Sequence, residues 1–340
     1  MKKKLSFLYA VLFIFFAILF IMKKNTDENN KEQNDEVDII SDLNFEYGQN
    51  ISLLLRKNNQ INNLDLNYYI LCVVASEMPF KFEYEALKSQ VVVARTYLFN
   101  KILSNGEEAA DVCDDYNHCQ AFLPLEDLER IWKEEKGFSD EEIKLGEEKL
   151  KKAIIDTKDL VIVYNGQIID ALFHSSSYMK TEDAKAIWSH EDVPYLKSVE
   201  SVEEEYETST SVVSIEKNEL LDKLKTKGYV EDVDNLDIAI YSYTDSGRVE
   251  FVKVGNSLVE ATTLRSIIGL KSTYFTIDDS DEYVSFNVLG FGHGVGLSQV
   301  GADTYAKQGM SFEDIIHHYY TDVDIVKMKY TKEEGVKYEN

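Results

Sequence analysis

The stretch ASEMPFKFEYEALKSQVVVARTY, residues 75–97, is the part of the chain around which the rest can be arranged. An apolar segment, residues 64–78, leads into it and predicts a buried helix. Pro79 disfavours helical backbone at Met78, so Glu77 is expected at the C-terminal end of that helix. The carbonyl end of a helix carries partial negative charge, which raises the pKa of a nearby carboxyl group. Glu77 is therefore a candidate general acid, although its position fits a solvated glutamate at a helix end equally well.

A second helix is predicted over residues 84–103. Its apolar residues recur at helical spacing along one side. They are Leu87, Val91, Ala94 and Leu98. Lys88 and Arg95 lie seven residues apart and share a different face of this helix. A carboxyl group at a turn, next to a rigid helix that presents two cations, is a plausible catalytic arrangement; a solvated polar face is the commoner alternative.

A second notable stretch, FNVLGFGHGVGLSQVG at residues 286–301, is rich in glycine. Its five glycines within twelve residues indicate that the backbone and His293 closely approach another part of the protein. Ser298 does not stand in a G-x-S-x-G nucleophile motif. The glycine spacing also differs from that of a dinucleotide-binding loop. We expect a helix ending near Lys307 to follow, and then a helix that begins at a capping box, Ser311–Asp314.

Residues 160–173 give the clearest hairpin signal in the chain. Two apolar strands flank an Asn-Gly pair at residues 165–166, which favours a type I′ turn. The hairpin leads to a polar HSSS tip, residues 174–177. His174 and Ser175 are not a nucleophile–base pair, because neighbouring strand residues point to opposite faces. The tip is either a binding edge or simply a loop.

Cys113, His118 and Cys119 fall within seven residues of an acidic segment. Thiolate and imidazole ligands suit zinc. The spacing is not the familiar C-x-x-C, and adjacent residues can bind one ion only if the loop bends. An exported chain could instead join the two cysteines in a disulfide. The spacing favours metal and disulfide equally, ahead of two free thiols, whereas Cys72 lies in an apolar run and is predicted to be buried.

The composition narrows the class of protein. The chain has 340 residues, 44% of them hydrophobic, and a net charge of −25. It is long enough for one large domain or two modest ones. Such an acidic chain, with no basic stripe outside its N-terminus, is not expected to bind nucleic acid.

The N-terminus predicts a membrane anchor. Residues 1–24 contain an uncharged apolar segment, Leu5–Met22, between lysines, and this length just spans a bilayer. The absence of a small-x-small cleavage site favours an uncleaved transmembrane anchor over a signal peptide. The lysines before the span place the N-terminus in the cytoplasm and the rest of the chain outside. Residues 25–45 are polar and acidic and predict a disordered tether.

The remaining pattern predicts an α+β fold with mixed helices and antiparallel strands. Residues 46–200 and 283–340 are expected to form a bilobal catalytic core. An acidic helical region, residues 124–156, belongs to this core. Residues 201–282 change character and are expected to form an inserted, smaller α+β lobe.

Three separated motifs together resemble the stage II sporulation protein D family, membrane-anchored lytic transglycosylases of endospore-forming bacteria. They are residues 75–97, the FHSSS segment at 173–177 with Trp188 downstream, and GFGHGVGLSQVGA at 290–302. With the middle lobe, the resemblance extends over residues 46–328. One departure is that Tyr178 and Met179 replace the glycines that more usually follow FHSSS.

The resemblance implies an enzyme that cleaves peptidoglycan glycan strands between MurNAc and GlcNAc, with formation of 1,6-anhydroMurNAc, during forespore engulfment. Glu77 matches the catalytic glutamate of the family, and Arg95 matches its second important basic residue. The expected substrate-binding residues are Lys88, Arg95, His174, Ser175, Ser176, His293 and Gln299. The implied partners are the glycan strands, a sporulation-stage amidase and a polytopic membrane protein of the same stage.

The resemblance also bears on the cysteine cluster. Some clostridial members hold zinc through two cysteines and a nearby histidine, and Cys113, His118 and Cys119 match that arrangement. It therefore favours a structural zinc ion over a disulfide. No second histidine lies between residues 100 and 117. A fourth ligand is then expected from an acid such as Glu107 or Asp111, from water, or from a distant histidine.

Two other functions fit the same residues. A non-catalytic domain that binds peptidoglycan and enhances a cell-wall amidase needs the same surface without turnover. A zinc-dependent amidase would instead use the cysteines and histidine as catalytic ligands.

Overall fold

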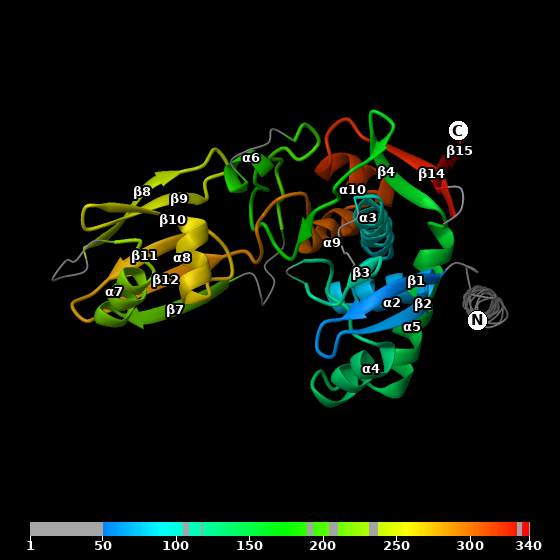
Figure 1. Cartoon of the computed structure of the whole chain (residues 1–340), viewed down its shortest axis with the longest axis horizontal. Helices are drawn as coiled ribbons and strands as arrows, with labels where there is room; N and C mark the ends of the chain where they lie inside the picture. Colours follow the sequence, from blue (N-terminus) through cyan, green and yellow to red (C-terminus); the bar gives the residue numbers. More distant parts are fainter. Residues whose placement is uncertain are drawn as a thin grey trace, which may run out of the picture. The chain divides into compact units, whose positions relative to one another are not determined.

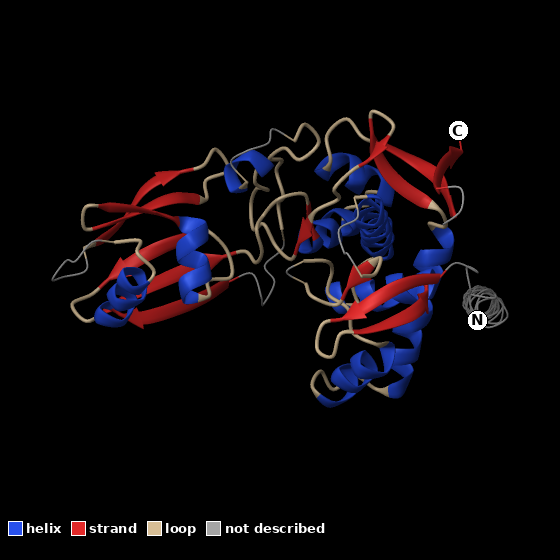
Figure 2. Ribbon diagram, in the orientation of Figure 1, coloured by secondary structure: helices blue, strands red, loops and turns tan. Residues whose placement is uncertain are grey.

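The structure is a computed structural model that describes residues 50–104, 109–116, 118–188, 193–203, 210–230, 237–331 and 335–339. The predicted anchor, residues 1–24, and the tether, residues 25–45, lie outside the described residues. Among the helices that are described, none is sufficiently long and apolar to cross a bilayer. Helices and mostly antiparallel strands are mixed along the chain (Figure 2), which confirms the α+β class.

Two helices contain most of the stretch at residues 75–97. α2, Leu66–Glu77, begins at Asp65, whose carboxylate accepts hydrogen bonds from N–H groups of the first turn. It ends where Met78 becomes extended before Pro79, as predicted. α3, Tyr84–Leu103, has the predicted bounds.

The remaining helices outside residues 210–289 follow α3 in the chain. α4 and α5 form the predicted acidic helical region, and α5 begins with a capping box at Ser139. Gly309, with φ of 95°, follows the end of α9, and Ser311 and Asp314 form the predicted capping box of α10. The bounds are α4 Leu125–Glu134, α5 Asp140–Asp156, α6 Ala184–Ile187, α9 Gln299–Lys307 and α10 Phe312–Tyr319.

Three small sheets accompany these helices, with strand orders β2-β1-β3, β15-β14-β4-β5 and β13-β6. The β1–β3 and β6–β13 pairs are parallel, and the other pairs in these sheets are antiparallel. The strands are β1 Asn50–Leu55, β2 Gln60–Asp65, β3 Val112–Cys113, β4 Leu160–Tyr164, β5 Gln167–Ile168, β6 Phe173–His174, β13 Leu297–Ser298, β14 Asp324–Thr331 and β15 Gly335–Glu339.

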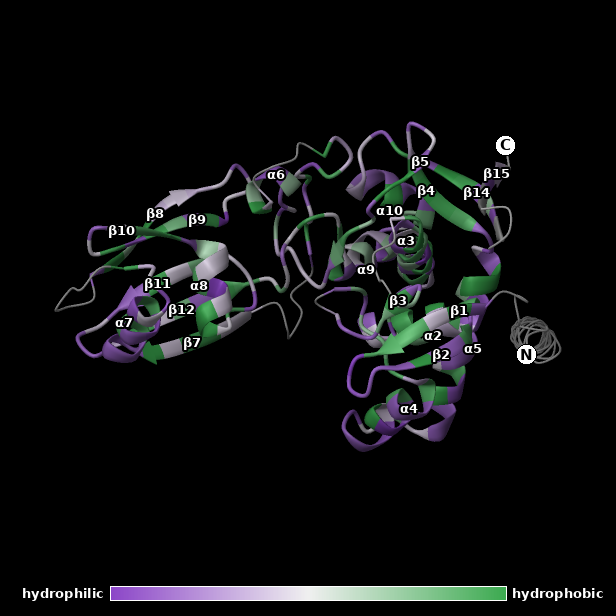
Figure 3. Cartoon of the chain, viewed as in Figure 1, coloured by the Kyte–Doolittle hydropathy of each residue, from purple (hydrophilic) through white to green (hydrophobic). Residues whose placement is uncertain are grey.

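α3 is buried on most sides and contacts α2, α5, α9, α10 and β4 (Figure 1). Every residue from Val91 to Phe99 is buried, including Arg95. Hydrophobic residues cover much of α3 and β4, whereas α4 is mainly hydrophilic (Figure 3). The predicted division of this helix into an apolar side and a polar face was therefore wrong. Helical spacing identified one apolar side, but neighbouring elements pack against the other sides as well.

Residues 210–289, here called the insert, form two three-stranded sheets, β10-β9-β8 and β11-β12-β7. Buried apolar residues from Ile215 to Val288 pack into one cluster within it. The predicted lobe boundary at residue 282 falls immediately before β12, which pairs with β7 and β11. The division into core and inserted lobe remains a prediction. The elements are β7 Thr210–Glu216, α7 Lys217–Thr226, β8 Ile238–Tyr243, β9 Val249–Val254, β10 Ser257–Glu260, α8 Ala261–Ile268, β11 Tyr274–Asp279 and β12 Tyr283–Leu289.

The FHSSS segment and the glycine-rich stretch meet at the β6–β13 pair, where His174 is the partner of Ser298. A Cβ atom at Gly292 would lie 2.7 Å from the His174 Cβ atom. A Cβ atom at Gly296 would lie 2.0 Å from the Leu172 carbonyl oxygen. Both glycines also have positive φ, 113° and 72°. The predicted close approach is confirmed, and its partner is the FHSSS segment.

Candidate active site

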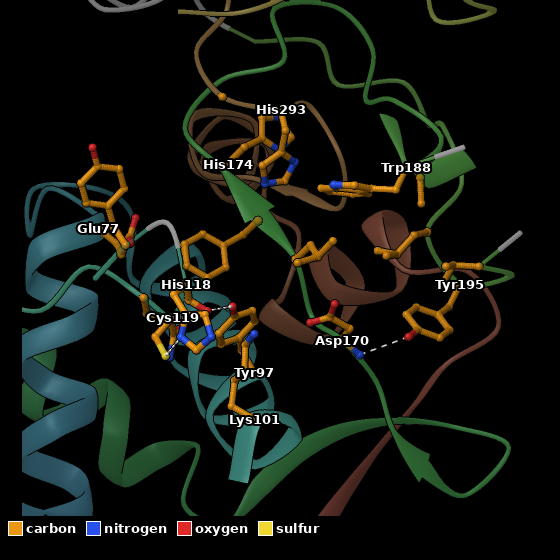
Figure 4. A pocket seen from close by; sticks show the side chains of 18 residues that line it. Glu77, Tyr97, Lys101, His118, Cys119, Asp170, His174, Trp188, Tyr195 and His293 are labelled. Carbon is orange, nitrogen blue, oxygen red and sulfur yellow. Dashed lines mark hydrogen bonds between the residues drawn. The ribbon is translucent and has the colours of Figure 1, made fainter. Parts of the chain in front are cut away.

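A pocket of about 700 Å³ lies where five segments come together (Figure 4). They are the end of α2, α3, the loop that carries Cys113, His118 and Cys119 (the cysteine loop), the FHSSS segment and the glycine-rich stretch. This volume is in the range of small-ligand sites. Residues from all of these segments line it, among them Glu77, Tyr97, Gln120, His174 and His293, and Trp188 at the end of α6 lines it as well.

Glu77 is the last residue of α2 and lines the pocket. One carboxylate oxygen, Oε1, accepts a hydrogen bond from the Ala121 N–H at 3.2 Å, and Oε2 accepts one from the Gln299 Nε2 group at 3.2 Å. Burial raises the pKa of Glu77 above its ordinary value, and these two hydrogen bonds partly oppose that shift. The predicted direction of the shift is supported, but burial rather than the helix end is its main cause.

Gln299 is the first residue of α9, and the contacts at the start of this helix fix its position. Ser298 is the N-cap, and its Oγ atom accepts a hydrogen bond from the Gly301 N–H at 3.3 Å. The preceding strand, β13, is fixed by its pairing with β6. Gln299 therefore approaches Glu77 from a helix end that is itself anchored to the FHSSS segment.

Glu203 is a functional candidate that sequence reasoning missed. Its carboxylate accepts hydrogen bonds from the Ser298 Oγ at 2.6 Å, from the Ser176 Oγ at 2.5 Å and from the Ser177 N–H at 2.8 Å. The Ser201 hydroxyl donates a fourth bond at 3.0 Å. Glu203 thus ties the FHSSS segment to the start of α9. Nothing in its sequence surroundings, an acidic run, distinguishes it from a solvated glutamate.

His174 and His293 lie at the pocket with their rings 5.6 Å apart, and the Trp188 ring lies 5.5 Å from that of His293. His174 Nδ1 is 3.1 Å from the Val295 carbonyl oxygen, so this nitrogen carries the proton. Its Nε2 atom then accepts from the Ser177 hydroxyl. Burial lowers the pKa of His174 and lowers that of His293 to about 4. Both rings are therefore neutral at physiological pH.

The two predicted substrate-binding serines, Ser175 and Ser176, lie outside the pocket lining. Ser176 is buried and donates its hydroxyl proton to Glu203. The Ser175 carbonyl oxygen accepts a hydrogen bond from the Val300 N–H at 3.0 Å, which again joins the two motifs. Neither serine lines the pocket.

Lys88 and Arg95 also lie away from the pocket lining. Lys88 pairs with Glu85 at 2.8 Å and stands 4.6 Å from the centre of the Phe312 ring. Arg95 is only 1% exposed, and its Nη1 atom donates to the Thr157 carbonyl oxygen at 2.7 Å and to that of Leu160 at 3.1 Å. Burial lowers the pKa of Arg95 to about 10. This placement does not fit the expected substrate contact, because the Arg95 side chain is buried against the segment that connects α5 to β4.

The cysteine loop brings three potential ligand atoms together. Cys113 Sγ, Cys119 Sγ and His118 Nδ1 are each 3.4 Å from the other two. The loop bends as a shared site requires, because the N–H groups of His118 and Cys119 both donate to the Asp115 carbonyl oxygen. The two cysteines are free thiols, with sulfurs too far apart for a disulfide.

The spacing of these three atoms fits one metal ion. An ion about 2.0–2.3 Å from each ligand atom, as zinc requires, can stand just outside the triangle that they form. The predicted fourth ligand Asp111 does not belong to this group, since its carboxylate accepts from the Ser52 N–H and hydroxyl at 2.7 and 2.8 Å. Glu107 lies outside the described residues. Within the described part of the chain the group consists of three residues.

Comparison with known proteins identifies the family. Residues 56–164 match the family model described as "Stage II sporulation protein". The chain is 32% identical over 275 residues to Stage II sporulation protein D of Bacillus subtilis (strain 168), which covers 79% of this chain and 76% of that protein. It is 31% identical over 274 residues to the protein of the same name from Bacillus amyloliquefaciens, with the same coverage.

A more distant relative carries a different name. The "Amidase enhancer" of Bacillus subtilis (strain 168) is 26% identical over 300 residues, which are 73% of this chain and 39% of that protein. The identity and coverage of the two closer relatives are decisive. This chain belongs to the stage II sporulation protein D family.

Proposed function

We propose that this protein is a lytic transglycosylase that cleaves peptidoglycan glycan strands between MurNAc and GlcNAc and leaves 1,6-anhydroMurNAc ends. The observation that carries the proposal is Glu77, a carboxyl group of raised pKa held by two donors in the wall of a pocket. Membership of the family supports a role in forespore engulfment during sporulation.

One carboxyl group is enough for this reaction. Protonated Glu77 donates its proton to the glycosidic oxygen as the bond to the anomeric carbon breaks. The resulting carboxylate takes the proton of the muramic acid 6-hydroxyl, whose oxygen bonds to the anomeric carbon of the same sugar. The attacking group is already part of the substrate, so no water molecule has to be positioned. Glu77 is protonated again at the end of the cycle.

The pocket offers surfaces that suit sugar rings. Trp188 is 46% exposed, and together with Tyr195 and Tyr97 it supplies aromatic surface to the lining. Aromatic faces pack against the apolar faces of sugars, and their polar edges remain available for hydrogen bonds. The neutral His174 and His293 rings line the same wall, and both nitrogens of His174 are already bonded within the protein.

The group of Cys113, His118 and Cys119 is proposed to hold a structural zinc ion. Bound zinc would fix the bend of the cysteine loop and supply no reactive water in this proposal. Ala121, which donates to Glu77, comes two residues after Cys119. Holding Cys119 in place therefore also holds one of the two donors to the Glu77 carboxylate.

The cellular location and the partners of the protein are proposals as well. An N-terminal anchor would place the catalytic part outside the cytoplasm, facing the intermembrane space during engulfment. The proposed partners are the glycan strands, a sporulation-stage amidase and a polytopic membrane protein of the engulfment complex.

The test uses the purified full chain in detergent with peptide-free glycan strands, followed by analysis of the product ends. Anhydro-ended fragments support the proposal. Glu77→Gln should remove the activity, whereas Glu141→Gln, an exposed residue in the first turn of α5, should keep it. Full cleavage by the Glu77→Gln variant would exclude the mechanism.

The name of the amidase enhancer relative suggests a second candidate function, the enhancement of a cell-wall amidase. In that case the pocket binds glycan without cleaving it, and the chain stimulates a separate amidase. Binding without any product, together with faster release of stem peptides when an amidase is added, would favour this function. Stem peptides released from intact wall by the chain alone would favour a zinc-dependent amidase.

A further inference from the structure

A second carboxyl group, that of Asp170, lines the same pocket as Glu77 (Figure 4). Asp170 lies between β5 and β6, whereas Glu77 ends α2. Neither the motifs nor the proposed mechanism assigns Asp170 a role. Its position raises the question of which ligand group it meets.

The backbone at Asp170 is held firmly. Its N–H donates to the Tyr195 hydroxyl oxygen at 3.1 Å, and its carbonyl oxygen accepts from the Leu172 N–H at 2.9 Å. Three residues later β6 begins, and β6 pairs with β13 next to Gln299. The backbone that carries Asp170 therefore continues into β6, which is paired with the strand just before Gln299.

The carboxylate itself lacks donors. No hydrogen bond to the Asp170 side-chain oxygens is formed from the residues that the structure describes, and burial raises its pKa. Lys101 lines the same pocket and its charge acts in the opposite direction, but it is not within ion-pair distance. The Asp170 oxygens are not among the fully buried polar atoms that lack a partner, so they can be reached from the pocket and can accept hydrogen bonds from a ligand. Glu77 differs in this respect, since two protein donors already hold its carboxylate.

The surroundings of Asp170 are aromatic. The Tyr195 hydroxyl oxygen accepts a hydrogen bond from the Asp170 N–H at 3.1 Å, and the Tyr320 hydroxyl donates to the carbonyl oxygen of Leu172, two residues further along, at 2.7 Å. Tyr97 and Tyr195 line the pocket with Asp170. An acceptor between aromatic rings suits a ligand that has apolar ring faces and several O–H or N–H donors at its edge, which is the chemistry of an N-acetylated amino sugar.

We propose that Asp170 forms a sugar-binding subsite in this pocket and accepts hydrogen bonds from hydroxyl or acetamide N–H groups of a glycan residue next to the scissile bond. This subsite rests on the proposed glycan substrate but not on its cleavage. Asp170 is thus a binding residue that positions the strand relative to Glu77, and it takes no part in proton transfer.

The test measures binding without turnover. Full-length Glu77→Gln protein is titrated with a peptide-free glycan oligosaccharide by calorimetry, alone and with Asp170→Ala or Asp170→Asn added. We expect Asp170→Ala to weaken the affinity by about tenfold or more, as loss of hydrogen bonds to a charged group implies. Asp127→Asn, on the outer helix α4, is the matched control and should leave the affinity unchanged. Melting temperatures of all variants establish that each is folded.

Kinetics on the Glu77-containing protein separates binding from chemistry. Asp170→Asn should raise KM, with the product ends still in the anhydro form. Equal affinity with and without Asp170, within twofold, would overturn the subsite, as would a fall in kcat at unchanged KM. If the parent protein binds the oligosaccharide in an Asp170-dependent way but cleaves nothing, the transglycosylase proposal fails and the subsite stands. If the parent protein does not bind it, both proposals fail.

Discussion

Replacement of Gln299 by methionine should make the Glu77 carboxyl group an even weaker acid. The Gln299 Nε2 group donates to Glu77 Oε2 at 3.2 Å and so stabilises the charged form of the carboxylate. Methionine has a similar length but no donor. Its introduction leaves Glu77 with the Ala121 N–H alone among the two donors described.

The size of the effect follows from the geometry. A hydrogen bond to a charged group contributes about 1.5–3 kcal/mol. A distance of 3.2 Å lies at the long end of the normal range, and Glu77 is only half-buried, so about 1 kcal/mol is a reasonable value. Since one pKa unit corresponds to about 1.4 kcal/mol, the pKa of Glu77 should rise by about 0.7 units.

The assay is the pH dependence of kcat/KM on peptide-free glycan strands, which reports the pKa of the free enzyme. The general acid must be protonated, so activity falls as the pH rises through the pKa of Glu77. Gln299→Met should move this alkaline limb to higher pH by about 0.7 units. Gln308→Met, at the exposed opposite end of α9, should leave it in place. An unchanged limb, or one that moves to lower pH, would refute the role given to Gln299.

Three further outcomes are expected. Glu77→Gln should raise the free energy of unfolding at neutral pH, because the half-buried carboxyl has a raised pKa; this advantage should vanish as the pH falls below the ordinary value of 4.5, which denaturant titration at several pH values can check. Cys113→Ser should abolish metal content and lower the melting temperature by about 5 °C, whereas Cys72→Ser should keep the metal; equal metal content in both would contradict the proposed site. Glu203→Gln should lower the free energy of unfolding by about 2 kcal/mol in a denaturant titration, because four donors lose their charged acceptor; an unchanged value would show that these bonds contribute little.

The elements were largely predictable because their signals are local. Pro79 ends α2 beside Glu77, and the bounds of α3 and the end of α5 at Asp156 agree with the sequence pattern. The Asn-Gly turn at residues 165–166 has both residues at positive φ, as the pair favours. Caps, turns and prolines act within a few residues, so they can be read without knowledge of the tertiary structure.

The site was less predictable because its chemistry depends on distant partners. Seven-residue spacing correctly places Lys88 and Arg95 on related faces of α3, but it does not say what those faces meet. Arg95 is buried against two carbonyl groups. Glu203 and Asp170 have no local signal at all, since their roles arise from groups that approach from other segments.

The cysteine cluster was more predictable than the rest of the site but less predictable than the helices and turns. Its residues were found by type and proximity, yet spacing left metal and disulfide equally favoured. The bend at Asp115 brings the three ligand atoms close enough together that they could hold one metal ion. A bend of this kind depends on backbone hydrogen bonds that the residue order does not reveal.

The β6–β13 pair has a consequence for folding. It joins segments so far apart that His174 contacts Val295, 121 residues further along the chain. Closing such a loop in an unfolded chain is entropically unfavourable, although the cost grows only slowly with length. The insert removes much of this distance, because its first and last residues, Thr210 and Leu289, are partners in adjacent strands. With Thr210 and Leu289 paired, residues 175–209 and 290–296 remain in the loop between β6 and β13, so the pocket wall should form more readily after the insert has folded.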